Sequence, residues 1–539
     1  MSRYNYSRRQ TLRVPVGTTA IGGREPLRLQ SMTNTPTLDT EASVEQCERI
    51  ARAGADLVRL TAQGVSHARN LGNIRRELRA RGIATPLVAD IHFNPAAAFA
   101  AAEEVEKVRI NPGNFVDPGR TFKKLSYTDE EYAAEIGRIR EKLVPFLALC
   151  REHGTAIRLG VNHGSLSDRI MSRYGDTPAG MVESVMEFLR ICREEGFDNV
   201  VISIKASNVV VMTATVRLLV ETMDAEGMRY PLHLGVTEAG DGEDGRVKSA
   251  VGIGSLLADG FGDTIRVSLS EAPEAELPVA RELADHIRTI AEAPEIQGPG
   301  KPAGQKYDER RPSREVTGIG ADKLAVGGSN QPAIVGLDFP AEAIPAGVKV
   351  LSSSHANRIG HIRAQIDALG DSTEPVIIRL SYPADMAPGR VALAAATDFG
   401  ALLLEGYRDG IWLEAPSLTK DQADSLALTI LQATRTRISR TEFIACPGCG
   451  RTLFDLPTVL GEIKAACSHL KGLKIGVMGC IVNGPGEMAD ADYGYVGAAA
   501  GHVSLYKGKE CVLKNIPAGE ALPRLIELLK ANGDWKDPE

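Results

Sequence analysis

Three cysteines near the C-terminus have the surroundings of metal ligands. Cys446 and Cys449 form a CxxC turn, and Cys480 lies in a glycine-rich run shortly after it. Two further cysteines, Cys467 and Cys511, fall in helix-like and strand-like stretches, where we expect buried apolar positions. The first three thiols therefore suit a redox pair, a structural zinc site or an iron–sulfur cluster.

These three chemistries make different demands on the sequence. A redox CxxC normally opens a helix and needs no third cysteine. A structural zinc site prefers four closed ligands, so it would also recruit Cys467, Cys511 or His469. An iron–sulfur cluster on three thiolates leaves one iron different from the others, which suits catalysis. The carboxylate of Glu487, seven residues beyond Cys480, could hold that iron weakly and be displaced.

A second set of reactive residues follows the predicted strands of the first half of the chain. Most are spaced two apart, and because strand side chains alternate with period two, each such pair points to one side. The set is Arg59 with Thr61, Asp90 with His92, Arg109 with Asn111, Arg158 with Asn162, Lys205 with Ser207, Thr237 with Glu238, and Arg266 with Ser268.

The cations of this set, one Lys and four Arg, predict an anion. Guanidinium groups match phosphate oxygens in a bidentate fork, and Lys supplies a point charge. Pairing within the protein does not account for all five, because only Asp90 and Glu238 are carboxylates of the same set. We therefore expect a substrate with two phosphoryl groups or one diphosphate. His92, Asp90 and Glu238 are the available proton donors and acceptors, with a purely structural role as the alternative for His92.

The elements that must position these residues repeat eight times within residues 1–270. A (β/α)8 barrel of about 250 residues fits this repeat, and its chemistry gathers at the C-terminal strand ends. An open doubly wound sheet would show a phosphate fingerprint after its first strand, and none is present. The predicted strands are Leu27–Thr33, Asp56–Thr61, Pro86–His92, Lys107–Asn111, Ala156–Asn162, Asn199–Lys205, Pro231–Thr237 and Asp263–Ser268.

The rest of the chain predicts two further domains. Residues 295–325 resemble an exposed linker. A smaller α/β domain follows, with strands expected at Ala333–Leu337, Val348–Ser352, Val376–Leu380, Ala401–Leu404 and Gly410–Leu413. A compact α+β module with an amphipathic helix at Leu456–Leu470 ends the chain. We predict a barrel domain over 1–295, a linker and α/β spacer over 296–438, and a cysteine domain over 439–539.

Composition narrows the class of protein. The 539 residues carry a net charge of −7, which argues against nucleic acid as a partner. No stretch approaches the roughly 20 apolar residues that span a bilayer. Residues 7–10 resemble a twin-arginine signal, but no apolar region follows, so we expect a cytoplasmic protein. Clustered cysteines in a reducing compartment favour metal over disulfides.

Five stretches together resemble the 4-hydroxy-3-methylbut-2-enyl diphosphate synthase family of the non-mevalonate isoprenoid pathway. They are residues 30–35, 88–93, 108–114, 446–451 and 479–487. The resemblance implies that 2-C-methyl-erythritol 2,4-cyclodiphosphate is reductively opened, with loss of water, to hydroxymethylbutenyl diphosphate. It also implies a 4Fe-4S cluster and single electrons from ferredoxin or flavodoxin.

Carried over to this sequence, the resemblance assigns roles to named residues. The cluster ligands are Cys446, Cys449, Cys480 and Glu487. Glu238 acts near the reacting carbons and Asn483 near the cluster-bound oxygen. The residues expected to bind substrate are Arg59, Arg109, Arg158 and Lys205, helped by Arg266, Ser268, Asn111, Asn162 and Ser207.

About 140 residues separate barrel and cysteine domain, so the chain resembles a three-domain form with a shortened middle domain. Directly joined forms imply a head-to-tail homodimer. We expect the middle domain to act as a spacer, with an open resting state in which the cysteines lie far from Arg59 and His92. The alternative function is a barrel transferase for a phosphorylated or pterin substrate with a structural zinc module. A nucleic-acid-binding zinc ribbon is disfavoured by the acidic chain.

Overall fold

The computed structural model describes residues 3–117, 126–299, 310–317, 324–481, 486, 488 and 490–538, and divides into two compact units. The barrel unit comprises Gln10–Gly242, Gly262–Ala280 and Arg440–Glu539. The insert unit comprises Met1–Arg9, Glu243–Phe261 and Arg281–Ser439. Those predicted site residues that the structure describes lie on the barrel unit.

The barrel unit contains the predicted (β/α)8 barrel. Eight parallel strands pair in the order β8-β7-β6-β5-β4-β3-β10-β9, and a parallel bridge between Ile202 and Leu232 closes the ring. The last two strands are shorter than predicted. The strands are β3 (Arg28–Met32), β4 (Leu57–Ala62), β5 (Leu87–Ile91), β6 (Lys107–Ile110), β7 (Ala156–Asn162), β8 (Val200–Lys205), β9 (His233–Leu234) and β10 (Thr264–Ile265).

A short hairpin covers the N-terminal end of the barrel. Its strands are β1 (Val14–Val16) and β2 (Thr19–Ile21), paired antiparallel. Val14, Val16 and Ile21 are fully buried in one cluster with apolar residues near the starts of four barrel strands. This end is therefore closed by apolar packing, and the polar strand ends face the opposite mouth.

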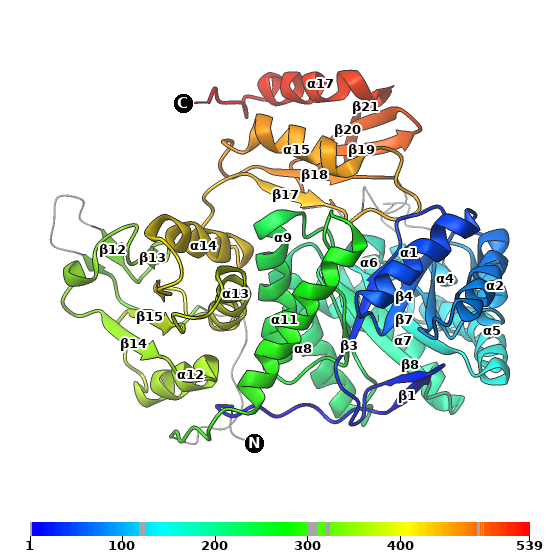
Figure 1. The fold of residues 1–539 in the computed structure, drawn as a ribbon, viewed down its shortest axis with the longest axis horizontal. Helices are drawn as coiled ribbons and strands as arrows, with labels where there is room; N and C mark the ends of the chain where they lie inside the picture. Colours follow the sequence, from blue (N-terminus) through cyan, green and yellow to red (C-terminus); the bar gives the residue numbers. More distant parts are fainter. Residues whose placement is uncertain are drawn as a thin grey trace. The chain divides into compact units, whose positions relative to one another are not determined.

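The helices around the barrel begin where the sequence supplies caps. Asn94, Asn111, Ser167 and Asn208 each accept a hydrogen bond from a backbone N–H in the first turn of the helix that follows, which satisfies donors that a helix start otherwise leaves unpaired. The helices of the barrel unit are α1 (Thr40–Arg52), α2 (Val65–Ala80), α3 (Pro95–Ala102), α4 (Pro112–Phe115), α5 (Asp129–His153), α6 (Asp168–Tyr174), α7 (Pro178–Glu194), α8 (Val209–Ala225) and the first turn of α11 (Glu276–Ala291) (Figure 1). The rest of α11, α9 (Gly242–Ser249) after its first residue, and α10 (Ser255–Ala258) belong to the insert unit.

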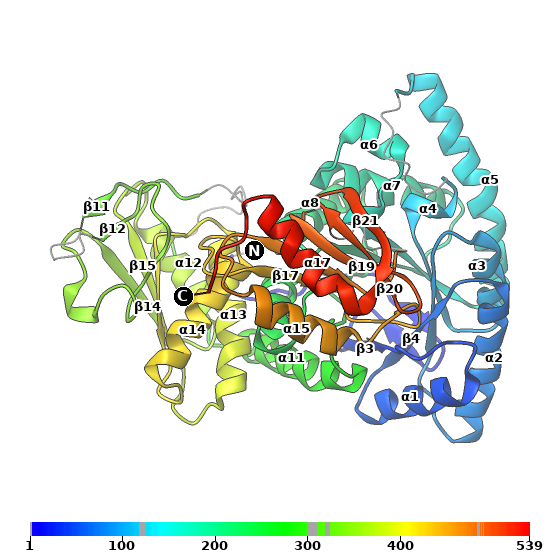
Figure 2. The same cartoon turned by 90° about the horizontal axis from the view of Figure 1, so that it is seen from above.

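The cysteine module, residues 440–539, is a five-stranded mixed sheet in the order β17-β18-β19-β20-β21. Helices α15 and α17 pack in one apolar cluster with one face of this sheet (Figure 2). Successive side chains along a strand lie on opposite faces of the sheet. Met478 is not part of the cluster that contains α15 and α17 but belongs to a separate apolar cluster. The elements are β17 (Glu442–Ala445), α15 (Leu456–Cys467), β18 (Lys474–Met478), β19 (Tyr493–Ala499), β20 (His502–Lys507), β21 (Glu510–Pro517) and α17 (Ala518–Ala531).

The two cysteines expected to be buried differ. Cys467 is fully buried at the end of α15, as predicted, and burial raises its pKa to about 11. Cys511 is exposed on β21, so the prediction of a buried position was wrong. Among the described strands, β21 pairs with β20 alone and forms an edge of the sheet, and edge strands leave one side open.

The insert unit contains a four-stranded parallel sheet in the order β13-β16-β15-β14. The strand expected at Ala401–Leu404 is instead the end of a helix that begins at Pro388, because a short apolar run does not distinguish a buried helix from a strand. The elements are β11 (Val316–Thr317), β12 (Ala325–Val326), β13 (Ala333–Ile334), β14 (Lys349–Ser353), α12 (Arg358–Ala368), β15 (Val376–Ser381), α13 (Pro388–Leu404), β16 (Gly410–Glu414) and α14 (Lys420–Ala433).

None of the helices in the described residues is long and apolar enough to cross a membrane.

Candidate active site

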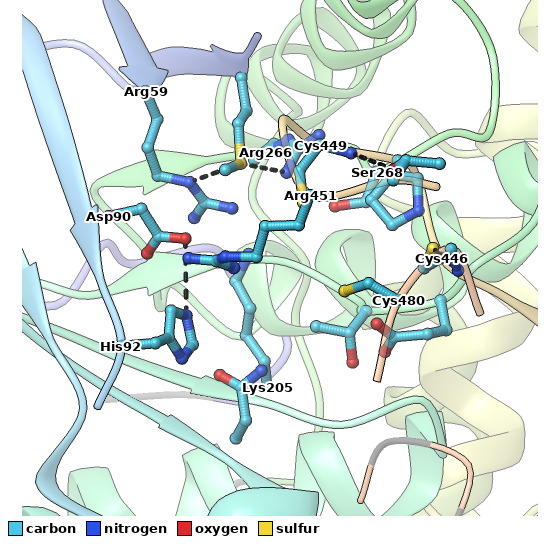
Figure 3. Close-up of a pocket in the computed structure, with 18 of the residues that line it drawn as sticks. Arg59, Asp90, His92, Lys205, Arg266, Ser268, Cys446, Cys449, Arg451 and Cys480 are labelled. Atoms are coloured by element: carbon cyan, nitrogen blue, oxygen red, sulfur yellow. Dashed lines mark hydrogen bonds and ion pairs between the residues drawn. The ribbon is translucent and has the colours of Figure 1, made fainter. Parts of the chain in front are cut away.

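One pocket at the barrel mouth contains most of the predicted site (Figure 3). Its empty space is about 810 Å³ including the open mouth. Barrel side chains line one part and cysteine-module residues the other. The lining includes Arg59, Asp90, His92, Arg109, Arg158, Asn162, Lys205, Glu238, Arg266, Ser268, Cys446, Cys449, Arg451 and Cys480.

The cysteine module contacts the barrel mouth of the same chain. Ala239, just after β9, forms a parallel bridge with Ala445 at the end of β17. The Ser270 hydroxyl donates to the Cys446 carbonyl at 2.8 Å, and Lys464 forms an ion pair with Asp241. The expected open state, with cysteines far from the barrel cations, is therefore not the conformation seen.

Arg109 is the best-partnered cation of the pocket. Its guanidinium donates to Asp90 at 3.3 Å, to the Gly160 carbonyl at 2.8 Å and to Asn162 Oδ1 at 3.0 Å. It also contacts His92 Nε2. Arg109 therefore organises the three strands β5, β6 and β7 at the mouth, and its charge is partly balanced by Asp90.

Arg266 has a carboxylate partner that the sequence analysis missed. Its guanidinium makes a bidentate pair with the buried Glu276, at 3.0 and 2.7 Å. Although burial opposes the charge, Glu276 raises the pKa of Arg266. The premise that only Asp90 and Glu238 are nearby carboxylates was therefore wrong, and Arg266 is balanced within the protein.

Arg59, Arg158 and Lys205 form no direct ion pair with a carboxylate among the described residues, although the charge of Asp90 acts on Arg59. Arg158 is 1% exposed, and its Nε and Nη1 have no hydrogen-bond partner there. Burial and the neighbouring arginines lower the pKa of Arg59 to about 10 and hold those of Arg158 and Lys205 well below their ordinary values. Gly235 makes room for Lys205, whose Nζ lies 2.9 Å from where a β-carbon would be. An anion in the pocket would relieve this accumulated charge.

The surroundings of Asp90 and His92 lower the pKa values of both side chains. Burial alone would raise the Asp90 pKa, but Arg59 and Arg109 hold it well below its ordinary value. Burial, reinforced by Arg109, lowers the His92 pKa to about 3. At neutral pH, Asp90 is thus a carboxylate and His92 a neutral ring that can accept a proton or hydrogen bond.

Glu238 stands out by its backbone. It lines the pocket, is buried, and has φ of 51°. A non-glycine residue in this left-handed region is uncommon and tends to mark functional positions. The turn aims a carboxylate at the pocket beside Thr237 and the cysteines.

Two predicted substrate residues do not line the pocket. Asn111 caps α4, accepting from the Gly113 N–H at 3.0 Å and donating to Ser165 at 2.7 Å. Ser207 is buried beyond β8. Asn162 and Ser268 do line the pocket. Glu487 and Asn483 lie outside the described residues.

The barrel interior holds polar groups that sequence reasoning did not single out. The Lys107 amine and both ring nitrogens of His233 are fully buried without hydrogen-bond partners in the described residues. Burial, with Arg158 as a neighbour of both, lowers their pKa values well below the ordinary ones. Strand alternation places both side chains inside the barrel. The sequence already showed this for Lys107, which lies two residues before Arg109.

The three cysteines predicted as ligands line one pocket, although no group of three His, Cys, Asp or Glu side chains in the described residues is already arranged as a metal site. The Gly479 N–H donates to Cys446 Sγ at 3.2 Å. Burial raises the Cys446 pKa to about 12, while N–H groups of Gly479 and Gly448 oppose this. Thiolates with backbone donors are what iron–sulfur clusters use, so the donor set fits such a cluster.

A (β/α)8 barrel with a cationic mouth facing clustered thiols defines an enzyme for a phosphorylated small molecule with a metal cofactor. Comparison with known protein families supports this class of enzyme. Residues 11–281 match the model of the GcpE TIM-barrel domain, and residues 442–531 match the GcpE protein C-terminal domain. The chain belongs to the GcpE family of 4-hydroxy-3-methylbut-2-en-1-yl diphosphate synthases, which are iron–sulfur oxidoreductases of isoprenoid biosynthesis.

Relatives match along the whole chain. The 4-hydroxy-3-methylbut-2-en-1-yl diphosphate synthase (flavodoxin) of Parabacteroides distasonis is 53% identical, covering 99% of this chain and 100% of the relative. That of Akkermansia muciniphila is 44% identical over 100% and 99%, and that of Chlorobaculum tepidum 40% over 99% and 90%.

Among solved structures, dihydropteroate synthase from Burkholderia cenocepacia covers 52% of this chain and 99% of its own, with a TM-score of 0.34 and 15% identity. A likeness this weak does not bear on function. The alternative function as a transferase with a zinc module is not favoured, because the full-length relatives share the synthase activity.

Proposed function

We propose that the pocket is the site where 2-C-methyl-erythritol 2,4-cyclodiphosphate is reductively opened to 4-hydroxy-3-methylbut-2-enyl diphosphate. One observation supports this most: barrel cations and three cysteines from the other end of the chain line the same cavity. The diphosphate would be held by Arg59, Arg158 and Lys205, which form no direct ion pair with a carboxylate among the described residues and of which Arg158 has two nitrogens without a hydrogen-bond partner there.

Other barrel residues would position rather than neutralise the substrate. Arg109 and Arg266 already have carboxylate partners, so we propose that they present their remaining donors to phosphate oxygens from fixed orientations. Ser268 and Asn162 supply neutral hydrogen bonds. Asn111 would act indirectly by capping α4, and Ser207 from beyond β8.

Proton handling falls to the pocket carboxylates and imidazole. Glu238, in its left-handed turn, is proposed to stand near the reacting carbons. Asp90 stays ionised and orients Arg109 and His92. Neutral His92 can accept a hydrogen bond from the substrate but is a poor proton donor at neutral pH.

We propose that Cys446, Cys449, Cys480 and Glu487 hold a 4Fe-4S cluster, with Asn483 close to the substrate oxygen next to it. When bound, the cluster supplies the two electrons and a Lewis-acidic iron at the carbon–oxygen bond that breaks. Flavodoxin, which is part of the relatives' names, or ferredoxin is the proposed donor. The cysteine module, which contacts the barrel mouth, would keep bulk water from the pocket.

The domain boundaries and setting are also proposals. We propose a barrel domain over 1–295, a spacer over 296–438 and a cluster domain over 439–539, with closure within one chain whether or not the protein forms a homodimer. A cytoplasmic location suits the eight free cysteines, which a reducing compartment preserves.

Mixing variants tests this arrangement. An Arg158→Ala chain binds substrate poorly, and a Cys480→Ala chain lacks a cluster ligand. Closure within one chain predicts no recovered activity when the two are mixed and mixed dimers are demonstrated. Recovered activity would show instead that one chain's cluster serves its partner's barrel. Each variant assayed without the other is the matched control.

A further inference from the structure

Arg451 enters the barrel pocket from the cysteine module. It follows Cys449 by two residues and lines the pocket. Figure 3 shows its long side chain extending from the cysteine loop toward the barrel residues. It is 8% exposed, and its Nη2 has no hydrogen-bond partner among the described residues. A buried guanidinium with an unused donor calls for an explanation, and an anion in the pocket would supply one.

Two buried carboxylates at the barrel mouth are already paired with barrel arginines. Asp90 accepts from Arg109, and Glu276 is paired bidentately with Arg266. Arg451 acts on His92 as a positive neighbour and contributes to its lowered pKa. Within the described residues, Arg451 therefore adds one more positive charge to a pocket that already contains Arg59, Arg158 and Lys205.

This charge has opposite effects in the empty and the filled pocket. Without an anion, Arg451 is repelled by the barrel cations when the module sits on the mouth. With a diphosphate present, the same guanidinium gains charge-assisted hydrogen bonds, which are roughly twice as strong as neutral ones. Docking of the module therefore becomes more favourable when the anion is bound, and by linkage the anion binds more tightly to the docked form.

The other contacts that hold the CxxC turn on the barrel are neutral and close. A β-carbon on Gly450 would lie 2.7 Å from the Thr35 carbonyl and 2.9 Å from Thr61 Oγ1. The Ser270 hydroxyl binds the Cys446 carbonyl. Uncharged contacts of this kind fix the position of the turn, but their strength does not depend on whether an anion is in the pocket. The charge of Arg451 does respond to a bound anion.

We propose that Arg451 is a substrate-sensing residue of the cysteine module, which binds the diphosphate and makes the docking of the module depend on it. The inference rests on the proposed function, because the diphosphate is taken to be the bound anion. It adds a binding residue from the cysteine side of the pocket to the cations of the barrel.

The test compares anaerobically prepared full-length holoenzymes: the parent, Arg451→Gln, Arg451→Lys and, as a matched loss of charge on exposed α17, Arg524→Gln. Substrate affinity is measured by calorimetry with the cyclodiphosphate. Amide hydrogen exchange is followed in segments 33–37 and 446–452 with and without substrate. Iron content and the absorption spectrum of each protein check that the cluster is retained.

We expect substrate to slow exchange in both segments of the parent and of Arg524→Gln. Arg451→Gln should bind about tenfold or more weakly, as expected for a lost charge-assisted hydrogen bond, and should lose the substrate-dependent protection. Arg451→Lys should recover part of both, because it keeps the charge. If Arg451→Gln loses iron, the comparison of Arg451→Lys with the parent decides, since a charge role predicts partial and not full affinity.

Equal affinity and equal protection in parent and Arg451→Gln would overturn the inference while leaving the proposed function intact. A parent protein that neither binds nor converts the cyclodiphosphate would instead overturn the proposed function. Inorganic pyrophosphate, tested in parallel, should give the same ordering of affinities if Arg451 recognises the diphosphate itself. A different ordering would count against that recognition.

Discussion

Replacing two arginines of one pocket should change stability in opposite directions. Arg158 is buried with two nitrogens lacking partners among the described residues, whereas Arg266 is paired bidentately with buried Glu276. Methionine has a similar length and no charge. Arg158→Met should therefore stabilise the substrate-free enzyme, and Arg266→Met should destabilise it.

The magnitudes follow from what each change leaves behind. An unsatisfied buried donor costs about 1–3 kcal/mol, so Arg158→Met should recover an amount of that order. Arg266→Met strands the Glu276 carboxylate in a buried site, and breaking a buried pair in this way costs about 3–5 kcal/mol. Substrate binding should nevertheless weaken in Arg158→Met by about 10- to 100-fold, since a charge-assisted hydrogen bond is worth about 1.5–3 kcal/mol.

The assay is thermal and denaturant unfolding of anaerobic holoenzyme, with substrate calorimetry on the same samples. The double variant Arg266→Met with Glu276→Leu is the control, because it removes both partners of the pair and should recover much of the lost stability. Destabilisation of Arg158→Met and Arg266→Met by equal amounts would refute the reasoning that one charge is balanced within the protein and the other is not.

Three further predictions concern the cluster and the barrel interior. Cys446→Ser and Cys480→Ser should lose iron, whereas Cys467→Ala, in the core of the module, should keep it; iron analysis that ranks them the other way would reject the ligand set. Lys107→Met should be more stable than the parent by about 1–3 kcal/mol at neutral pH. Since the folded-state pKa of Lys107 is lowered, the unfolded chain binds more protons up to pH about 10.5, so parental stability gains with pH and the difference should shrink between pH 7 and 10. A difference that grows with pH would contradict this. Glu487→Cys should assemble a cluster yet turn over slowly, because thiolate holds iron more firmly than carboxylate; full activity would show that this ligand need not leave.

The barrel and its mouth were predictable from strand alternation. Pairs such as Asp90 with His92 point to one side because neighbours two apart do so in any strand, and both line the pocket. Asn111 shows where this rule stops. It is the residue immediately before α4, and its side chain caps that helix instead of entering the pocket.

Charge balance was less predictable than position. Glu276 lies at the start of α11, outside any strand end, and only the closed barrel brings it to Arg266. Sequence spacing carries no signal for a contact of this kind. Arg451, in contrast, was visible beside the CxxC turn, but its entry into the barrel pocket follows from the docking of the module, which the sequence does not specify.

The remaining differences have local causes. The apolar run at Ala401–Leu404 reads equally well as a strand or a buried helix, and the helical start at Pro388 decided it. Cys511 precedes two apolar residues in a strand-like run, yet it lies on the strand at the sheet edge. A strand's place in its sheet depends on pairing with distant segments, which periodicity does not reveal.

The chain should open the cyclodiphosphate with electrons delivered at its cysteine-lined barrel mouth. The most direct measurement is anaerobic incubation of purified holoenzyme with the cyclodiphosphate and reduced flavodoxin, with the product identified by mass spectrometry and oxidised flavodoxin counted. We predict 4-hydroxy-3-methylbut-2-enyl diphosphate, about two one-electron equivalents consumed per molecule formed, and no product from a Cys480→Ser chain. A colourless protein that contains zinc and leaves the cyclodiphosphate unchanged would contradict the account.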